Sequence, residues 1–186
     1  MSNILVNTIK DTGNNTLLSS DGSGSVTASS SLASSVQSVG GIQNTPAFEA
    51  YLSADQSISN NTATKINWNA ERFDIGSVYD TSTYRFTIPS GYAGKYHIYS
   101  QIMMSLVDSA TLVLYLYKNG SQILVNEKKV GEDGNRDIII STTVNCAVGD
   151  YFEMYCYQNT GVSKNIESEA SNNAPSLFGA FKLIGA

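Results

Sequence analysis

Apolar and polar residues alternate with a period of two along most of the chain after Pro46. In the clearest run, leucines occupy positions 112, 114 and 116, and Asn119-Gly120 follows them. This alternation is typical of β-strands, and Asn-Gly between two such runs is typical of a tight hairpin. The pattern predicts strands at 47–52, 64–68, 84–88, 96–102, 112–117, 122–125, 138–144, 151–157 and 177–183. Many short strands without helical periodicity predict an all-β sandwich or jelly roll.

Several predicted strands are apolar or aromatic on both faces. In the 112–117 strand the three leucines form the predicted core face, and the opposite face is too aromatic to be left bare in water. Tyrosine buries a large area and keeps a polar tip, as interface cores prefer. We therefore expect one outer aromatic face to form a subunit interface, with a carbohydrate-stacking groove as the weaker alternative. Its expected residues are Tyr99, Val113, Tyr115, Tyr117, Tyr155 and Tyr157.

The first 24 residues contain short apolar runs and turn residues but too little apolar material for a core of their own. We expect them to form an arm that becomes ordered by adding a strand to a neighbouring protein. A frayed terminus is the alternative. Residues 25–45 are rich in Ser and Gly and are expected to be a linker, which leaves residues 46–186 as a single domain.

Composition excludes several classes of function. Charged residues make up 15% of the chain and the net charge is −5, so there is no basic stripe for a phosphate backbone. No apolar run approaches the length of a membrane span, and the N-terminus does not resemble a secretion signal. We therefore expect neither a nucleic-acid partner nor membrane insertion. The two cysteines, Cys146 and Cys156, are expected to be buried free thiols, as suits a protein made in a reducing cytoplasm.

The residues offer little for catalysis. The single histidine, His97, lies in a predicted strand, and neither a nucleophile elbow nor a phosphate-binding loop occurs. We expect no enzymatic activity and no cofactor. The acidic segment around Asp133 and Asp137 could supply oxygen ligands to calcium, although a solvated loop is the preferred interpretation. The long loops 55–63, 126–137 and 158–175 suit either polar ligands such as glycans or simple connections.

The ordered set of segments over residues 46–186 resembles the globular head of the complement C1q and tumour-necrosis-factor-like superfamily. The matching segments are 46–52, 79–80 leading to 84–89, 94–98, 116–120, 149–150 and 176–183. The resemblance implies a ten-stranded jelly roll that assembles as a homotrimer, with aromatic residues around the threefold axis. The chain has no collagen repeat and no disulfide pattern, which argues against complement or hormone roles.

The start of the chain resembles structural proteins of tailed bacteriophages. The matching residues are 3–11 and 17–24. This resemblance implies a virion protein that is synthesised in the host cytoplasm and anchored through its N-terminal arm. The expected anchoring residues are Ile4, Leu5, Val6, Ile9, Leu17 and Leu18.

The two resemblances together predict a homotrimeric capsid decoration or cement protein whose partners are other virion proteins, above all the major capsid protein. The alternative is a short tail fibre or receptor-binding protein, which would contact tail proteins and glycans on the host surface. Three arms delivered together gain avidity without strong individual contacts. A lectin-like module outside a virion would leave the arm without a role.

Overall fold

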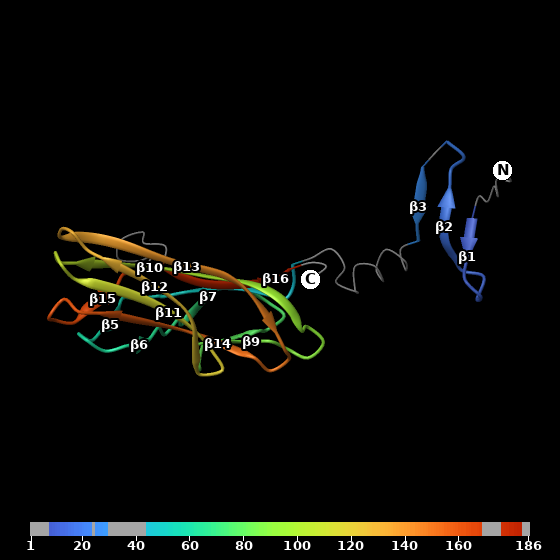
Figure 1. Ribbon diagram of the computed structural model, residues 1–186. Helices are drawn as coiled ribbons and strands as arrows, with labels where there is room; N and C mark the ends of the chain where they lie inside the picture. Colours follow the sequence, from blue (N-terminus) through green and yellow to red (C-terminus); the bar gives the residue numbers. More distant parts are fainter. Residues whose placement is uncertain (1–7, 24, 30–43, 169–175, 184–186) are drawn as a thin grey trace. The chain divides into compact units, whose positions relative to one another are not determined.

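The computed structural model describes residues 8–23, 25–29, 44–168 and 176–183, and all regular secondary structure in these ranges is β-strand (Figure 1). The chain divides into two compact units, residues 1–43 and 44–186. Across the described residues, no helix is long and apolar enough to cross a membrane.

The N-terminal unit is a small antiparallel sheet with the order β1-β2-β3. Its strands are β1 (Thr8–Lys10), β2 (Thr16–Ser20) and β3 (Val26–Ala28). The β1–β2 turn is held by the Asp11 carboxylate, which accepts a hydrogen bond from the backbone N–H of Asn15 at 2.9 Å. Residues 26–28 were expected to lie in the linker, and their pairing with β2 corrects that expectation.

The larger unit, which we call the body, consists of two antiparallel sheets packed as a sandwich (Figure 1). Six strands of the seven-stranded sheet follow the order β5-β15-β10-β16-β4-β7. The seventh, β13, pairs with β10 outside this order. The strands of this sheet are β4 (Ala47–Tyr51), β5 (Gln56–Ile58), β7 (Ala70–Ile75), β10 (Gly94–Leu106), β13 (Gly134–Cys146), β15 (Lys164–Ile166) and β16 (Leu177–Lys182).

The six-stranded sheet has the order β12-β11-β14-β9-β8, and β6 also pairs with β14. Its strands are β6 (Thr64–Lys65), β8 (Tyr79–Asp80), β9 (Arg85–Thr87), β11 (Thr111–Lys118), β12 (Ser121–Lys129) and β14 (Tyr151–Gln158). The predicted hairpin joins β11 to β12: Lys118 pairs with Ser121, and Asn119 and Gly120 have φ of 51° and 77°. These two positive φ values are the ones that an Asn-Gly turn supplies at little cost.

Every strand predicted after Pro46 overlaps a strand of the structure, but four strands were missed. β5 and β15 lie inside segments expected to be loops, and β8 is only two residues long. β7 was missed because Glu71, Arg72 and Asp74 interrupt its apolar pattern, as is common for a strand at the edge of a sheet. Short or charged edge strands are defined mainly by their partners, so their own sequence carries little signal.

The core lies between the two sheets. Leu112, Leu114 and Leu116 are fully buried in it, as predicted. Its centre is aromatic. The ring centroid of Phe48 lies 4.8 Å from that of Tyr79, 4.9 Å from that of Phe86 and 5.1 Å from that of Phe178. Edge-to-face and offset pairs of this kind add to the stabilisation from burial.

Both cysteines are free and buried, as predicted. Burial raises the pKa of Cys146 to about 11 and that of Cys156 further still. Both thiols are therefore protonated at neutral pH, and we expect them to react slowly with thiol reagents.

Candidate functional site

The six residues expected to share one aromatic face lie on two different sheets. Tyr99 belongs to β10 of the seven-stranded sheet, whereas Val113, Tyr115, Tyr117, Tyr155 and Tyr157 belong to β11 and β14 of the six-stranded sheet. The outer faces of a two-layer sandwich point in opposite directions. The expectation of a single face is therefore wrong, because alternation distinguishes core from outside but does not tell which layer a strand joins.

The outer face of the seven-stranded sheet carries an aromatic cluster, which we define as His97, Tyr99 and Phe181. The ring centroids lie 5.9 Å apart for His97 and Tyr99, 5.2 Å for His97 and Phe181, and 6.4 Å for Tyr99 and Phe181. The cluster forms because β10 and β16 are neighbours, with His97 paired directly with Phe181. Sequence reasoning missed Phe181 and assigned His97 no specific role.

Tyr99 is fixed in this cluster by contacts on both sides. Its hydroxyl donates a hydrogen bond of 2.8 Å to Glu49 Oε2, and Glu49 also pairs with Arg72. Burial, followed by the bond to Glu49, raises the pKa of Tyr99. Across the sheet its ring lies over Gly179, where an added Cβ would be only 2.5 Å from the ring. The absence of a side chain at Gly179 therefore creates the space that Tyr99 occupies.

Apolar side chains extend this face beyond the aromatic cluster. Three of the large apolar residues that remain exposed lie on it: Phe73, Ile75 and Ile139, with 42%, 52% and 50% of their surface accessible. The outward positions of the central strands from 97 to 103 and 177 to 181 are uncharged: His97, Tyr99, Gln101, Met103, Leu177, Gly179 and Phe181. Aromatic enrichment with few charges is characteristic of an interface core.

The outer face of the six-stranded sheet carries a row of tyrosines. The Tyr117 ring centroid lies 4.6 Å from that of Tyr155 and 6.3 Å from that of Tyr115. Val113, directly across from Tyr157, is only 5% exposed although it lies outside the main core cluster. Burial raises the pKa of Tyr115 and Tyr155. This row is therefore already half-buried by its own side chains.

Charges also cross this second face. Glu153 is only 3% exposed, and its Oε1 atom accepts hydrogen bonds from Lys65 Nζ at 2.6 Å and from Arg85 Nε at 2.7 Å. The Arg85 guanidinium also lies 4.3 Å from the centroid of the Tyr151 ring. The six-stranded face thus contains a compensated ion-pair network at its centre, which makes it a less suitable interface core than the face of the other sheet, where the outward positions from 97 to 103 in β10 and from 177 to 181 in β16 carry no Asp, Glu, Lys or Arg.

Only part of the expected anchoring segment can be placed. Ile4, Leu5 and Val6 lie outside the described residues. Ile9 is 47% exposed in β1, and Leu17 and Leu18 are half-buried in β2. None of the described residues of this unit is buried, so the three short strands lack a core of their own, as the sequence predicts. Sheets this small are marginally stable without a further surface to cover them.

The weak calcium candidates do not form a ligand set. Asp133 Oδ1 accepts a hydrogen bond from the backbone N–H of Asp108 at 2.7 Å, and Asp137 Oδ1 lies 3.5 Å from Lys128 Nζ. Within the described ranges, no three His, Cys, Asp or Glu side chains come together in a way that could hold a metal ion. These two carboxylates instead stabilise the β12–β13 connection.

Solved structures with the same architecture come from the tumour-necrosis-factor and C1q groups. The chain is 14% identical to the Eiger TNF of S. frugiperda, with a TM-score of 0.56 over 75% of this chain and 93% of that one. Murine APRIL gives 15% identity and a TM-score of 0.55, over 74% of this chain and 98% of that one. The globular domain of zebrafish complement 1qA is 13% identical, with a TM-score of 0.50 over 73% of this chain and 93% of that one. No protein-family model and no curated protein matches the sequence. The body is a C1q/TNF-like jelly-roll β-sandwich.

Proposed function

We propose that this chain is a non-enzymatic virion structural protein of a tailed bacteriophage: a homotrimeric capsid decoration or cement protein. The proposal combines the phage-like N-terminal sequence with one structural observation. A strand unit in which no described residue is buried precedes a jelly-roll body with its own aromatic core. In this arrangement the N-terminal unit attaches to the particle and the body is displayed on it.

The proposed trimer forms through the outer face of the seven-stranded sheet. Its outward positions from 97 to 103 in β10 and from 177 to 181 in β16, which include the aromatic cluster, carry no Asp, Glu, Lys or Arg, and exposed Phe73, Ile75 and Ile139 lie on the same face. Burying apolar surface contributes roughly 25 cal/mol per Å², so a face of this kind supplies a favourable association energy. Of the residues first expected at the interface, Tyr99 belongs to this face.

The N-terminal unit is the proposed anchor. Among the described residues, the outer edges of β1 and β3 have no partner strand, and the apolar residues Ile9, Leu17 and Leu18 remain at least partly accessible. Both features suit pairing with a strand of the capsid shell. A trimer would deliver three such units together, so weak individual contacts suffice for stable attachment.

Deletion of residues 1–43 tests the anchoring role. The remaining body keeps its core, and we expect it to stay folded and trimeric but to be absent from purified virions. The measurement is quantitative mass spectrometry of particles grown with the wild-type or the truncated protein. Leu18→Asp should also reduce the amount of the protein in virions. Thr27→Ala, which changes an exposed polar position of the same unit, should leave that amount unchanged. Normal incorporation of the truncated body would contradict the anchoring role.

Copy number separates this function from the alternative of a short tail fibre that contacts host glycans. A shell protein is present in hundreds of copies and a fibre in tens at most. Localisation in an electron-microscopy map of the virion gives the same distinction directly. Absence of the protein from virions altogether would contradict both roles.

A further inference from the structure

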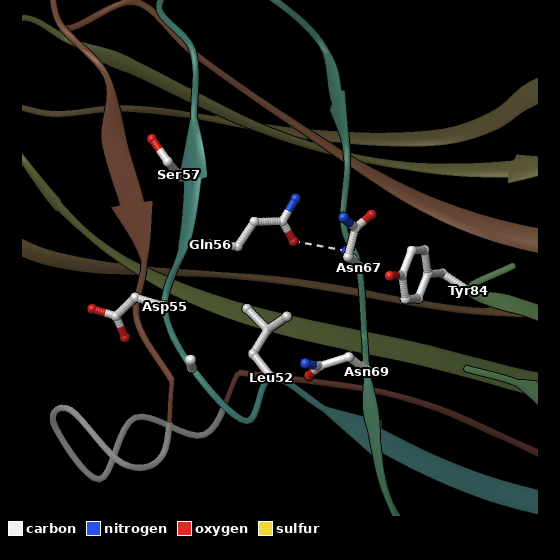
Figure 2. A pocket seen from close by; sticks show the side chains of 8 residues that line it. Leu52, Asp55, Gln56, Ser57, Asn67, Asn69 and Tyr84 are labelled. Atoms are coloured by element: carbon white, nitrogen blue, oxygen red, sulfur yellow. Dashed lines mark hydrogen bonds between the residues drawn. The ribbon is translucent and has the colours of Figure 1, made fainter. Parts of the chain in front are cut away.

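A polar pocket of about 310 Å³ lies in the body, at the end of β4 remote from Pro46 (Figure 2). Three separate segments line it: residues 52–57, which run from the end of β4 into β5, residues 67–69 before β7, and Tyr84 before β9. Its lining includes the buried Leu52 and the polar side chains of Gln56, Asn67, Asn69 and Tyr84. This volume lies at the small end of the range of about 300–1,000 Å³ that is typical of ligand pockets.

Two of the amide side chains are held rigidly by the protein. Gln56 Oε1 accepts a hydrogen bond from the backbone N–H of Asn67 at 2.7 Å, drawn as the dashed line in Figure 2, and Gln56 Nε2 donates to the Lys65 carbonyl at 2.8 Å. Asn69 exchanges two hydrogen bonds of 2.9 Å with the backbone and hydroxyl of Ser53. The pocket wall is therefore preorganised, which lowers the entropic cost of binding.

The other polar groups are available to a ligand. Among the described residues, the Asn67 amide and the hydroxyls of Ser57 and Tyr84 make no hydrogen bond to the protein. The Tyr84 backbone has a φ of 55°, in the left-handed region, and Lys65 Nζ lies 5.9 Å from its ring centroid. In Figure 2 the Tyr84 ring lies beside Asn67 and Asn69, with its hydroxyl directed toward them. The Asn67 amide thus offers one donor and one acceptor beside the Tyr84 ring and hydroxyl, whereas the Ser57 hydroxyl is directed away from them in Figure 2.

The charges around the pocket disfavour ionic ligands. Lys65 Nζ already donates to Glu153 Oε1 and to the Thr83 carbonyl, both at 2.6 Å, so it is compensated and cannot serve a phosphate. Asp55 Oδ1 accepts hydrogen bonds from the N–H and the hydroxyl of Ser168 at 2.8 and 2.9 Å. The best chemical match is a neutral ligand that offers several adjacent donors and acceptors together with an apolar C–H face.

We infer that this pocket binds a neutral saccharide unit of a glycan. Amide side chains, which donate and accept side by side, match the alternating hydroxyls of a pyranose ring, and the Tyr84 ring can pack against its C–H face. The inference holds for either location in the virion, and it can fail while the virion role stands.

The test uses the full chain and defined sugars. A printed array of neutral and acidic glycans identifies candidates, and methyl glycosides of mannose, galactose, glucose and N-acetylglucosamine are then titrated at millimolar concentrations. Saturation-transfer NMR on the sugar reports binding. We expect at least one neutral glycoside to bind, and Asn67→Ala and Tyr84→Ala each to weaken its Kd by roughly three- to tenfold, the value of one or two hydrogen bonds.

The controls separate the pocket from general effects. Asn135→Ala changes an exposed asparagine in another part of the body and should leave the Kd unchanged. Tyr84→Phe keeps the ring and should weaken binding less than Tyr84→Ala. If Tyr84→Ala impairs folding, Asn67→Ala carries the test alone, because its side chain is exposed. The inference is overturned if no neutral sugar binds, if only N-acetylneuraminic acid binds, or if Asn67→Ala binds as the wild type does.

Discussion

At the scale of single residues, Glu153 is the most consequential charge in the body. It is nearly inaccessible, and Lys65 and Arg85 both donate to the same carboxylate oxygen. Burial by itself raises its pKa, but the hydrogen bonds and positive charges of the two partners outweigh burial and hold the pKa below the usual 4.5. A buried carboxylate of this kind is stabilising only while both partners remain in place.

The lowered pKa of Glu153 predicts acid sensitivity. Its contribution to stability is fully present above the unfolded-state pKa near 4.5 and is lost as the pH falls through the lower folded-state value. We expect Glu153→Gln to lower the free energy of unfolding at pH 7 by about 1–2 kcal/mol, and by clearly less at pH 3. Chemical denaturation at the two pH values, at a fixed protein concentration, measures both differences. An equal loss at pH 7 and pH 3 would contradict this assignment.

At the scale of elements, the close approach of β10 and β16 determines the shape of the outer face. Tyr99 pairs directly with Gly179, and the ring crosses the position where a side chain would stand. The carbonyl oxygen of Phe48 on the other neighbouring strand lies 3.0 Å from the same position, so the space is limited by backbone as well as by side chain. Gly179 therefore allows β16 to pack closely between β10 and β4.

Gly179→Ala should therefore destabilise the body. The added methyl group must displace the Tyr99 ring and press against the Phe48 carbonyl, and we expect a loss of about 1–3 kcal/mol in the free energy of unfolding, as is typical of overpacking. Denaturant unfolding measures the loss. Gly131→Ala is the matched control, because a Cβ there meets nothing within 4 Å. Adding Tyr99→Ala to Gly179→Ala should recover part of the loss, and unchanged stability of the single variant would show that β16 can shift freely.

At the scale of the whole molecule, the outer faces of the two sheets differ in how far they already bury their own aromatic and charged side chains. The face of the six-stranded sheet packs its tyrosines against one another and neutralises its central charges. The face of the seven-stranded sheet has an aromatic cluster with exposed apolar side chains around it, and its Glu49–Arg72 ion pair lies beside Tyr99. The face of the seven-stranded sheet gains more from burial against a partner, which is why we assign the proposed trimer interface to it.

Sedimentation of two matched variants tests this assignment. The full wild-type chain should sediment as three copies of the 20.0 kDa chain. Phe181→Asp places an uncompensated charge in the proposed interface and should yield monomers, because an unpaired buried charge costs several kcal/mol. Tyr117→Asp makes the same kind of change on the other face and should leave the trimer intact. A monomeric wild type, or dissociation by Tyr117→Asp alone, would refute the assignment.

The sequence by itself determined the fold class, the main strands and the core face of the central hairpin. These follow from local rules: alternation identified Leu112, Leu114 and Leu116, and Asn119-Gly120 marked the turn. The same alternation correctly predicted that the tyrosines of β11 and β14 point away from the core. The free, buried state of both cysteines could likewise be predicted, since the expected hairpin register kept them apart.

Only the tertiary structure decided which outward residues lie together. Tyr99 and Tyr115 show the same alternation, yet they belong to opposite layers, because strand pairing is chosen among distant segments and no local pattern encodes it. The same reason explains why Phe181 joins Tyr99, why Lys65 and Arg85 meet Glu153, and why three separate segments line the polar pocket. Each of these groupings depends on contacts between residues far apart in the chain, which exist only once the sandwich has formed.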